Sequence, residues 1–131
     1  MKVLIVEKDK TIRQSLSYFV EHQKDCEVFL ASSKKEGASL FKTIPFDMVL
    51  CGDRLPDGGG LEILKEWMSK NPKLVSILMT VQNDEWMKEE ARKAGVHGFL
   101  VKPFDLKQLE EAMSISEFGL RSAELIHDGR R

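Results

Sequence analysis

Side chains of the kinds that bind phosphoryl groups or metal ions follow several short apolar runs, each at the point where the run ends. They are two acids flanking a lysine, an aspartate, a threonine and a second lysine: Glu7, Lys8, Asp9, Asp53, Thr80 and Lys102. Carboxylates ligate divalent cations, while hydroxyl and ammonium groups donate to phosphoryl oxygens. If the apolar runs are neighbouring parallel strands, these groups meet in one crevice, because ligands bind outside the carboxyl ends of such strands. The predicted chemistry is that of a phosphoryl or metal site.

The segment CGDRLPDGGG, residues 51–60, has the composition of a strand end followed by a tight turn. It places Asp53 just beyond an apolar run. Asp57 and the glycines after it predict a turn and the start of a helix, because glycine permits positive φ. By contrast, residues 7–10 contain no glycine. A nucleotide-type phosphate loop needs glycines directly after the first strand, so that class of enzyme is excluded.

The elements that must position these residues are short β-rich runs alternating with segments of helical period. The predicted strands are Lys2–Val6, Glu27–Leu30, Met48–Cys51, Val75–Met79 and Gly98–Val101. Several are continuously apolar, which is typical of strands buried on both faces of a parallel sheet.

The segments between the strands carry helix start and stop signals. These are N-caps, capping boxes and a terminating glycine: Asp9, Ser33 with Glu36, Asp84, Gly95, and Asp105 with Gln108. The alternation predicts an α/β fold. It is a (βα)5 doubly wound, five-stranded parallel sheet in a flavodoxin-like three-layer sandwich with right-handed crossovers.

Composition limits the classes of protein that fit. A chain of 131 residues, 42% hydrophobic and 31% charged, predicts one globular domain. The formal net charge of −1 gives no reason to expect direct binding to nucleic acid or to an anionic membrane. No run is long enough for a membrane span, and Cys26 and Cys51 are expected to be reduced, so we expect a cytoplasmic protein. His22 and His97 are expected on the surface.

With these elements placed, residues Lys2 to Ser116 resemble the response-regulator receiver domain of two-component signalling. The motifs that carry the resemblance, by their order and spacing, are Leu55-Pro56-Asp57-Gly58, Ala94-Gly95 through Gly98-Phe99, and Val101-Lys102-Pro103-Phe104. The resemblance implies a receiver-like sandwich. It also implies an aspartate after the third strand that accepts a phosphoryl group from a histidine kinase, with Mg²⁺ bound by an acidic pair after the first strand.

Part of the family's site carries over residue by residue. Thr80 matches the hydroxyl that bonds the phosphoryl group, and Lys102 matches the lysine that neutralises it. Phe99 matches the aromatic residue that reports the switch, and Glu7 falls on the first acid of the pair. The resemblance also implies a cis peptide bond between Lys102 and Pro103.

Two positions depart from the family pattern. The acceptor stands four residues before the proline of the Leu-Pro pair, and counting back from Pro56 gives Gly52, so that Asp53 is one residue late. Lys8 stands at the second acid, the one that normally ligates Mg²⁺. A one-residue offset matters because successive side chains of a strand point to opposite faces. Two readings of Asp53 remain: a displaced phosphoacceptor, or a loop carboxylate paired with a lysine.

Charge counting predicts poor metal binding. The acidic positions of the family's pocket and its lysine are here Glu7, Lys8, Gly52 and Lys102, a formal +1, which Asp53 would bring to 0. Mg²⁺ takes one or two carboxylates, so no metal and no cofactor is expected. If Mg²⁺ binds at all, Glu7 and Asp53 are its expected ligands.

The other pocket residues allow alternatives. Lys8 is either a tethered cation bonded to Glu7 or Asp53, or a solvated lysine. Asp9 is expected to be a helix N-cap rather than a ligand. Thr80 and Lys102 either bind an anion or only stabilise the loops. Phe99 is either a rotamer switch or a half-buried strand aromatic.

The predicted function is that of a receiver module of a two-component phosphorelay, not an enzyme, and a degenerate pseudo-receiver because of Gly52 and Lys8. The alternatives are a working phosphoreceiver with Asp53 as acceptor and, more weakly, a flavodoxin-like cofactor binder. Expected partners are a sensor histidine kinase or other signalling protein and an output domain. The resemblance implies that the face from about Asp84 to Ser116, the fourth helix through the fifth, meets a partner or a second copy. The predicted receiver domain covers residues 1–116, and residues 117–131 are the end of the last helix, a linker stub or a disordered tail.

Overall fold

The computed structural model describes residues 1–23, 26–81 and 84–114. Its strands are β1 (Lys2–Val6), β2 (Glu27–Ala31), β3 (Met48–Gly52), β4 (Arg54–Leu55), β5 (Gly58–Gly59), β6 (Val75–Thr80) and β7 (Gly98–Val101). Its helices are α1 (Lys10–Glu21), α2 (Lys34–Thr43), α3 (Gly60–Lys70) and α4 (Glu85–Ala94). A further helix occupies residues 106–114 at the end of the described chain, and we call it the C-terminal helix. The predicted boundary at residue 116 lies outside the described residues and stays a prediction.

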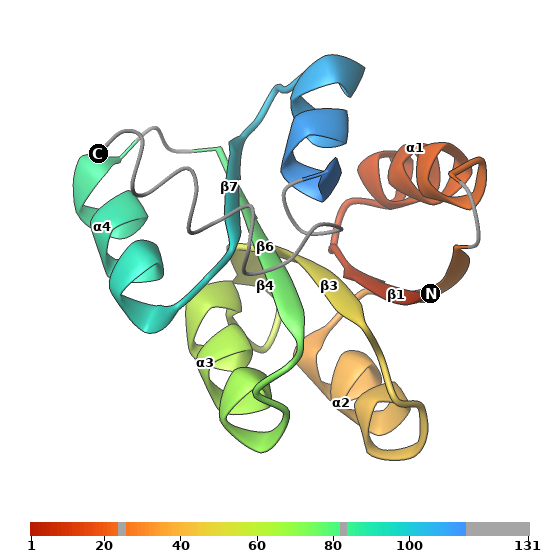
Figure 1. Cartoon of the computed structure of the whole chain (residues 1–131), viewed down its shortest axis with the longest axis horizontal. Coiled ribbons are helices and arrows are strands. Elements are labelled where there is room, and N and C mark those ends of the chain that lie inside the picture. Colours follow the sequence, from red (N-terminus) through yellow and green to blue (C-terminus); the bar gives the residue numbers. More distant parts are fainter. Residues whose placement is uncertain (24–25, 82–83, 115–131) are drawn as a thin grey trace.

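The main sheet has five strands in the order β2-β1-β3-β6-β7, and every pair is parallel. The predicted (βα)5 doubly wound architecture is therefore confirmed (Figure 1). Three predicted strands, β2, β3 and β6, each extend one residue further than the apolar pattern indicated, to Ala31, Gly52 and Thr80. The short antiparallel hairpin β4–β5 was not predicted, because two-residue strands carry no periodic signal.

Helices cover both faces of the sheet. α1 and the C-terminal helix pack on one face, against a cluster that includes Val3, Ile5 and Leu50. α2, α3 and α4 pack on the other face, against Leu4, Val49 and Leu78. The arrangement is visible in Figure 1, where α1 and the blue C-terminal helix lie above the sheet and α2 and α3 below it. Alternate residues of each strand thus supply two separate cores, which explains the continuously apolar runs.

The predicted helix caps are found where the sequence placed them. The Asp9 carboxylate accepts from Ile12 N, the Ser33 hydroxyl from Glu36 N, and the Asp84 carboxylate from Trp86 N. Gly95 ends α4 in the left-handed region at φ 92°. These signals are local, so the sequence alone determines them.

Residues 56–57 form the predicted turn and α3 begins at Gly60 as predicted, but the Asp57 carboxylate has a task that the sequence did not indicate. This carboxylate does not start α3; it accepts from the backbone N–H groups of Lys34 and Lys35, at 2.7 and 2.9 Å, and so caps α2. Those two hydrogen bonds hold the pKa of Asp57 below its usual range. α3 begins after Gly59, which offers no side-chain cap.

No helix within the described parts of the chain is long and apolar enough to cross a bilayer. Cys51 is a free thiol buried in the core, and Cys26 is half-buried. Burial raises the pKa of the Cys51 thiol, and the carboxylates of Glu7 and Asp53 raise it further. Cys51 is therefore an unreactive core residue, because the thiolate is the reactive form.

His97 is half-buried rather than on the surface as expected. Its Nδ1 lies 3.2 Å from Ser76 N, the backbone donor at the start of β6, and burial lowers the pKa of the imidazole. The folded protein therefore favours neutral His97, whereas the unfolded chain takes up a proton at the ordinary value of about 6.5. His22 is exposed at the end of α1.

We predict that the free energy of unfolding decreases as the pH falls from about 7 through the ordinary histidine value of about 6.5, because the unfolded chain binds the proton first. Urea unfolding at several pH values measures this. The His97→Gln variant should lose part of the slope, and the His22→Gln variant should keep it. An unchanged slope in His97→Gln would show that the loss of stability comes from other groups.

Candidate functional site

Four of the predicted site residues come together at the carboxyl edge of the sheet. Glu7 follows β1, Asp53 follows β3, Thr80 ends β6 and Lys102 follows β7. These strands are neighbours in the order β1-β3-β6-β7, so their ends open onto one crevice. Glu7, Asp53 and Thr80 are buried, at 1%, 9% and 1% relative exposure.

Lys102 forms a buried ion pair with Glu7. The distance from Lys102 Nζ to Glu7 Oε1 is 2.6 Å, and the two side chains are 15% and 2% exposed. The other carboxylate oxygen of Glu7 accepts from Asp9 N at 2.9 Å. A buried carboxylate is tolerated only when it is paired and hydrogen-bonded, and Glu7 meets both conditions. The Lys102–Pro103 peptide bond is cis, as the resemblance implied.

The Glu7 carboxylate lies beside Gly52, the position that the family's acceptor would occupy. A Cβ atom added to Gly52 would lie only 2.8 Å from Glu7 Oε1 and 3.6 Å from Glu7 Cδ. The space in which a side chain at position 52 would begin is thus taken by the glutamate. The sequence analysis matched Glu7 to the first acid of the family's pair and did not connect it with Gly52.

Asp53 is fixed by its backbone and bonds Thr80. Asp53 N donates to Met79 O at 2.6 Å, and Gly60 N donates to Asp53 O at 2.7 Å. Thr80 Oγ1 donates to Asp53 Oδ2 at 3.2 Å. The interpretation of Asp53 as a partner of a lysine is wrong, because among the described residues Lys102 pairs with Glu7 and Asp53 enters no ion pair. The β3 register aims Asp53 toward β6, which periodicity alone does not reveal.

The residues after β1 do not form the predicted cation bridge. Lys8 is exposed, and within the described chain it forms no ion pair with Glu7 or Asp53. The prediction of a bonded cation at Lys8 is therefore wrong, and the solvated reading holds. Asp9 is the N-cap that was expected. Arg13, which sequence reasoning missed, donates from Nη1 to the carbonyl oxygens of Glu7 and Lys8 at 2.6 and 3.3 Å, and so braces this loop.

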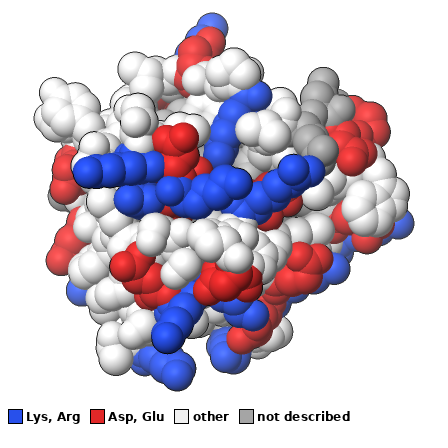
Figure 2. Space-filling view, turned by 180° about the vertical axis from the view of Figure 1, so that it is seen from behind, with Lys and Arg blue, Asp and Glu red and all other residues white. Residues whose placement is uncertain are grey.

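Lys and Arg side chains are prominent on one face of the molecule. Figure 2 shows them in a narrow band across the face opposite to that of Figure 1, with acidic side chains directly below the band. The exposed Lys8 and Arg54 follow neighbouring strands, β1 and β3. The exposed side chains of Lys8 and Arg54 are basic, while the acids Glu7 and Asp53 after the same strands are buried.

The oxygen atoms of the crevice are not arranged to ligate a divalent cation. One oxygen of Glu7 faces the Lys102 ammonium and the other faces Asp9 N, while Asp53 accepts from Thr80. Within the described residues, no group of three or more His, Cys, Asp or Glu side chains is placed to hold a metal ion. Mg²⁺ prefers several free oxygen ligands, so binding here would require these bonds to break.

Phe99 is a half-buried residue of β7 that packs against the core on the α2–α4 side of the sheet. A cavity of about 160 Å³ lies beside Phe99, between α4 and β7. Its lining includes Phe99, Val96, Ala91 and Lys88. Both predicted roles of Phe99, switch and packing residue, stay open. Trp67 is a packing residue, stacked on Phe41 with ring centroids 4.8 Å apart.

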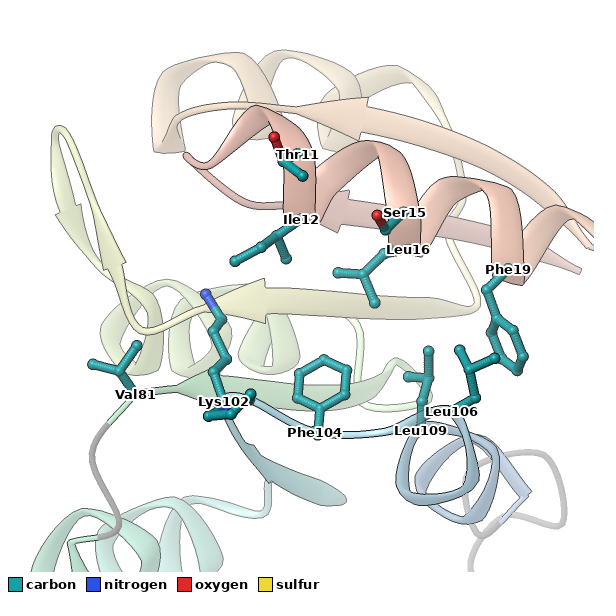
Figure 3. Close-up of a pocket in the computed structure, with 11 residues that line it drawn as sticks. Thr11, Ile12, Ser15, Leu16, Phe19, Val81, Lys102, Phe104, Leu106 and Leu109 are labelled. Atoms are coloured by element: carbon teal, nitrogen blue, oxygen red, sulfur yellow. The ribbon is translucent and has the colours of Figure 1, made fainter.

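A separate apolar groove lies between α1 and the C-terminal helix. It has a volume of about 390 Å³. Its lining includes Ile12, Phe19, Phe104 and Leu106, with Lys102 at one end (Figure 3). In Figure 3 the Lys102 ammonium lies at one end of the groove, on the side of Ile12 near the start of α1. The groove therefore adjoins the crevice but shares only Lys102 with it.

Comparison with known proteins identifies the protein family to which the chain belongs. Residues 3–114 match the family model of the response regulator receiver domain. The chain therefore belongs to the response-regulator receiver family. Receiver domains are signalling modules.

Relatives and solved structures agree with that assignment. The chain is 33% identical over 113 residues to the response regulator protein PilR of Pseudomonas aeruginosa, covering 86% of this chain and 25% of PilR. It is 32% identical over 108 residues to the regulatory protein AtoC of Escherichia coli, covering 82% of this chain and 23% of AtoC. The structure is similar to the non-phosphorylated HemR receiver domain of Leptospira biflexa, with a TM-score of 0.80 and 27% identity over 88% of this chain and 92% of that one. The chain spans about a quarter of the length of these two curated relatives.

The start of α3 lies against the end of β3 so closely that its first residue has no room for a side chain. A Cβ atom on Gly60 would overlap the carbonyl oxygen of Gly52 and come within 3.1 Å of Asp53 Cα. Both contacts are with backbone, so neither can be relieved by a rotamer change. Gly58, in the adjacent hairpin, has only ordinary contacts, the nearest at 3.5 Å.

We predict that Gly60→Ala lowers the free energy of unfolding by about 1–3 kcal/mol, the usual cost of overpacking, and weakens the Asp53–Thr80 bond. Gly58→Ala, the matched control, should change it by no more than about 0.5 kcal/mol. Denaturant unfolding of both variants measures the difference. Equal stability of the two would show that α3 can shift away from β3 without cost.

Proposed function

We propose that this domain is a pseudo-receiver: a receiver module that regulates an output domain or partner protein by binding, without accepting a phosphoryl group. The observation that supports it is the position of Glu7. Its carboxylate is paired with Lys102 at 2.6 Å and lies where a side chain at position 52 would begin. The lysine that the family uses to neutralise the phosphoryl group is thereby already neutralised.

The charge of the crevice supports the same proposal. Phosphoryl transfer needs a divalent cation, which neutralises the charge that develops in the transition state. Lys8 and Gly52 stand at two positions where the family has acids, and both acids that remain nearby, Glu7 and Asp53, are engaged with donors inside the domain.

The second candidate is a working phosphoreceiver with Asp53 as the acceptor. The bond from Thr80 to Asp53 favours it, because a hydroxyl beside the acceptor is the arrangement that the family uses. Against it, Asp53 is only 9% exposed and lies one residue beyond the acceptor position. A flavodoxin-like cofactor binder is a weaker candidate, since the strand ends carry no cofactor motif.

The expected partners follow from this role. They are a sensor histidine kinase or another signalling protein, and an output domain, in the cytoplasm. The α4–β7–C-terminal helix face is the proposed surface for a partner or a second copy. Trp86, on α4, is 67% exposed and supports this assignment.

We predict that incubation with acetyl phosphate and Mg²⁺ leaves the mass of the protein unchanged. Intact mass spectrometry measures this, with Asp53→Ala as the control. A phosphoryl adduct in the wild type that is absent from Asp53→Ala would replace the pseudo-receiver proposal with the second candidate.

We predict that the double variant Lys8→Asp/Gly52→Asp binds Mg²⁺ at least about tenfold more tightly than the wild type, a difference of about 1.4 kcal/mol. The Cβ atom of an aspartate at position 52 would lie 2.8 Å from the present position of Glu7 Oε1, so the glutamate would have to move away. Together with the aspartate introduced at position 8, the one at position 52 would supply the oxygen ligands that are now missing. Isothermal titration calorimetry measures the affinity.

The matched control for this prediction is the variant Lys10→Asp/Gly58→Asp. It carries the same change in charge outside the crevice and should bind Mg²⁺ no better than the wild type. An equal gain in Mg²⁺ affinity in the two variants would show that net charge alone, and not the crevice, determines that affinity.

A further inference from the structure

Exposed basic side chains gather around the carboxyl ends of β2, β1 and β3, which are neighbours in that order. We call them the strand-end basic cluster: Lys8, Lys10, Lys34, Lys35 and Arg54. All are exposed except Lys34, which is partly exposed. None of the five enters an ion pair with another residue of the described chain.

The chain folds so that the members of this cluster come close together. Lys8 and Arg54 follow the adjacent strands β1 and β3, whose ends touch where the Glu7 carboxylate meets Gly52. The β4–β5 hairpin then turns back to the start of α2, because Asp57 caps the N–H groups of Lys34 and Lys35. The Lys34 side chain reaches the hairpin, with its Cδ 3.5 Å from the place of a Cβ on Gly58.

The carboxylates at this edge are occupied within the domain. Asp9 and Asp57 accept from helix N-termini, and Glu36 accepts from the backbone and hydroxyl of Ser32. Glu7 and Asp53 are buried and bonded to Lys102 and Thr80. The five cations outnumber the three exposed carboxylates of this edge, Asp9, Glu36 and Asp57, so the edge carries a net positive charge that attracts an anionic group and repels a divalent cation.

We propose that the strand-end basic cluster binds an acidic segment of a partner protein, a short run rich in Asp and Glu. This inference rests on the proposed function, since it gives the chemistry of the partner that would bind the crevice in place of covalent modification. A short acidic segment fits better than nucleic acid. The exposed carboxylates of Asp9, Glu36 and Asp57 lie among the cations of this edge, so an extended phosphate backbone would meet those acids. The formal net charge of −1 adds a general repulsion for a long polyanion.

Fluorescence anisotropy with a short fluorescein-labelled polyglutamate peptide at low salt tests the proposal. The wild type should bind, and added salt should weaken binding because the charges are exposed. The variant Lys8→Glu/Arg54→Glu should bind at least about tenfold more weakly. The matched control Lys65→Glu/Lys88→Glu reverses two exposed, unpaired lysines on α3 and α4 and should stay within about twofold of the wild type. All four substituted side chains are exposed, so thermal unfolding should show both variants folded.

Three outcomes would overturn the proposal: no binding by the wild type, equal loss in both variants, or tighter binding of a single-stranded oligonucleotide of the same length than of the peptide. The last result would identify the cluster as a nucleic-acid surface. The acetyl phosphate experiment tests the pseudo-receiver proposal separately from the peptide-binding experiment. An adduct at Asp53 together with peptide binding would refute the pseudo-receiver role alone, and no adduct with no peptide binding would refute the acidic-segment partner alone.

Discussion

The ion pair between Glu7 and Lys102 is the interaction on which the rest of the crevice depends. It joins the ends of β1 and β7, 95 residues apart in sequence, at a distance of 2.6 Å. A carboxylate that is 2% exposed stays charged only if its oxygens are satisfied, and here the lysine and Asp9 N satisfy them. Having reached this place, Glu7 constrains position 52, because any side chain there would begin against its oxygen. The glutamate, the glycine and the lysine thus form one arrangement, in which the departures from the family pattern at positions 7 and 52 are linked.

A second arrangement holds Asp53 beside it. The backbone of Asp53 is bonded to β6 through Met79 and to the start of α3 through Gly60, and its carboxylate is bonded to Thr80. These contacts tie the loop after β3 to both of its neighbours and leave the carboxylate little freedom. The crevice therefore contains two acid–donor pairs, already satisfied, in the place where a receiver domain holds its reactive aspartate and metal.

Membership of the receiver family and the departures at the crevice are compatible, because a fold and a site are specified by different residues. The two cores on either side of the sheet specify the architecture, and they are shared in outline with the HemR receiver domain at a TM-score of 0.80. The crevice residues Glu7, Asp53, Thr80 and Lys102 belong to neither core.

The sequence by itself determined what depends on neighbouring residues along the chain. The apolar runs located the strands of the main sheet to within a residue at their ends, and the caps at Asp9, Ser33 and Asp84 followed from spacing. The predicted parallel arrangement of the strands indicated that Thr80 and Lys102 lie at one edge with Glu7 and Asp53, since parallel strands end together. The resemblance added the cis bond before Pro103.

Only the tertiary structure decided which of these groups bond to one another. Lys102 pairs with Glu7 and not with Asp53, Asp57 caps α2 and not α3, and His97 accepts from β6. Each of these contacts joins residues more than twenty positions apart, so no local pattern records it. Their geometry depends on strand register and on how the loops between the strands pack, which exist only once the sheet has formed.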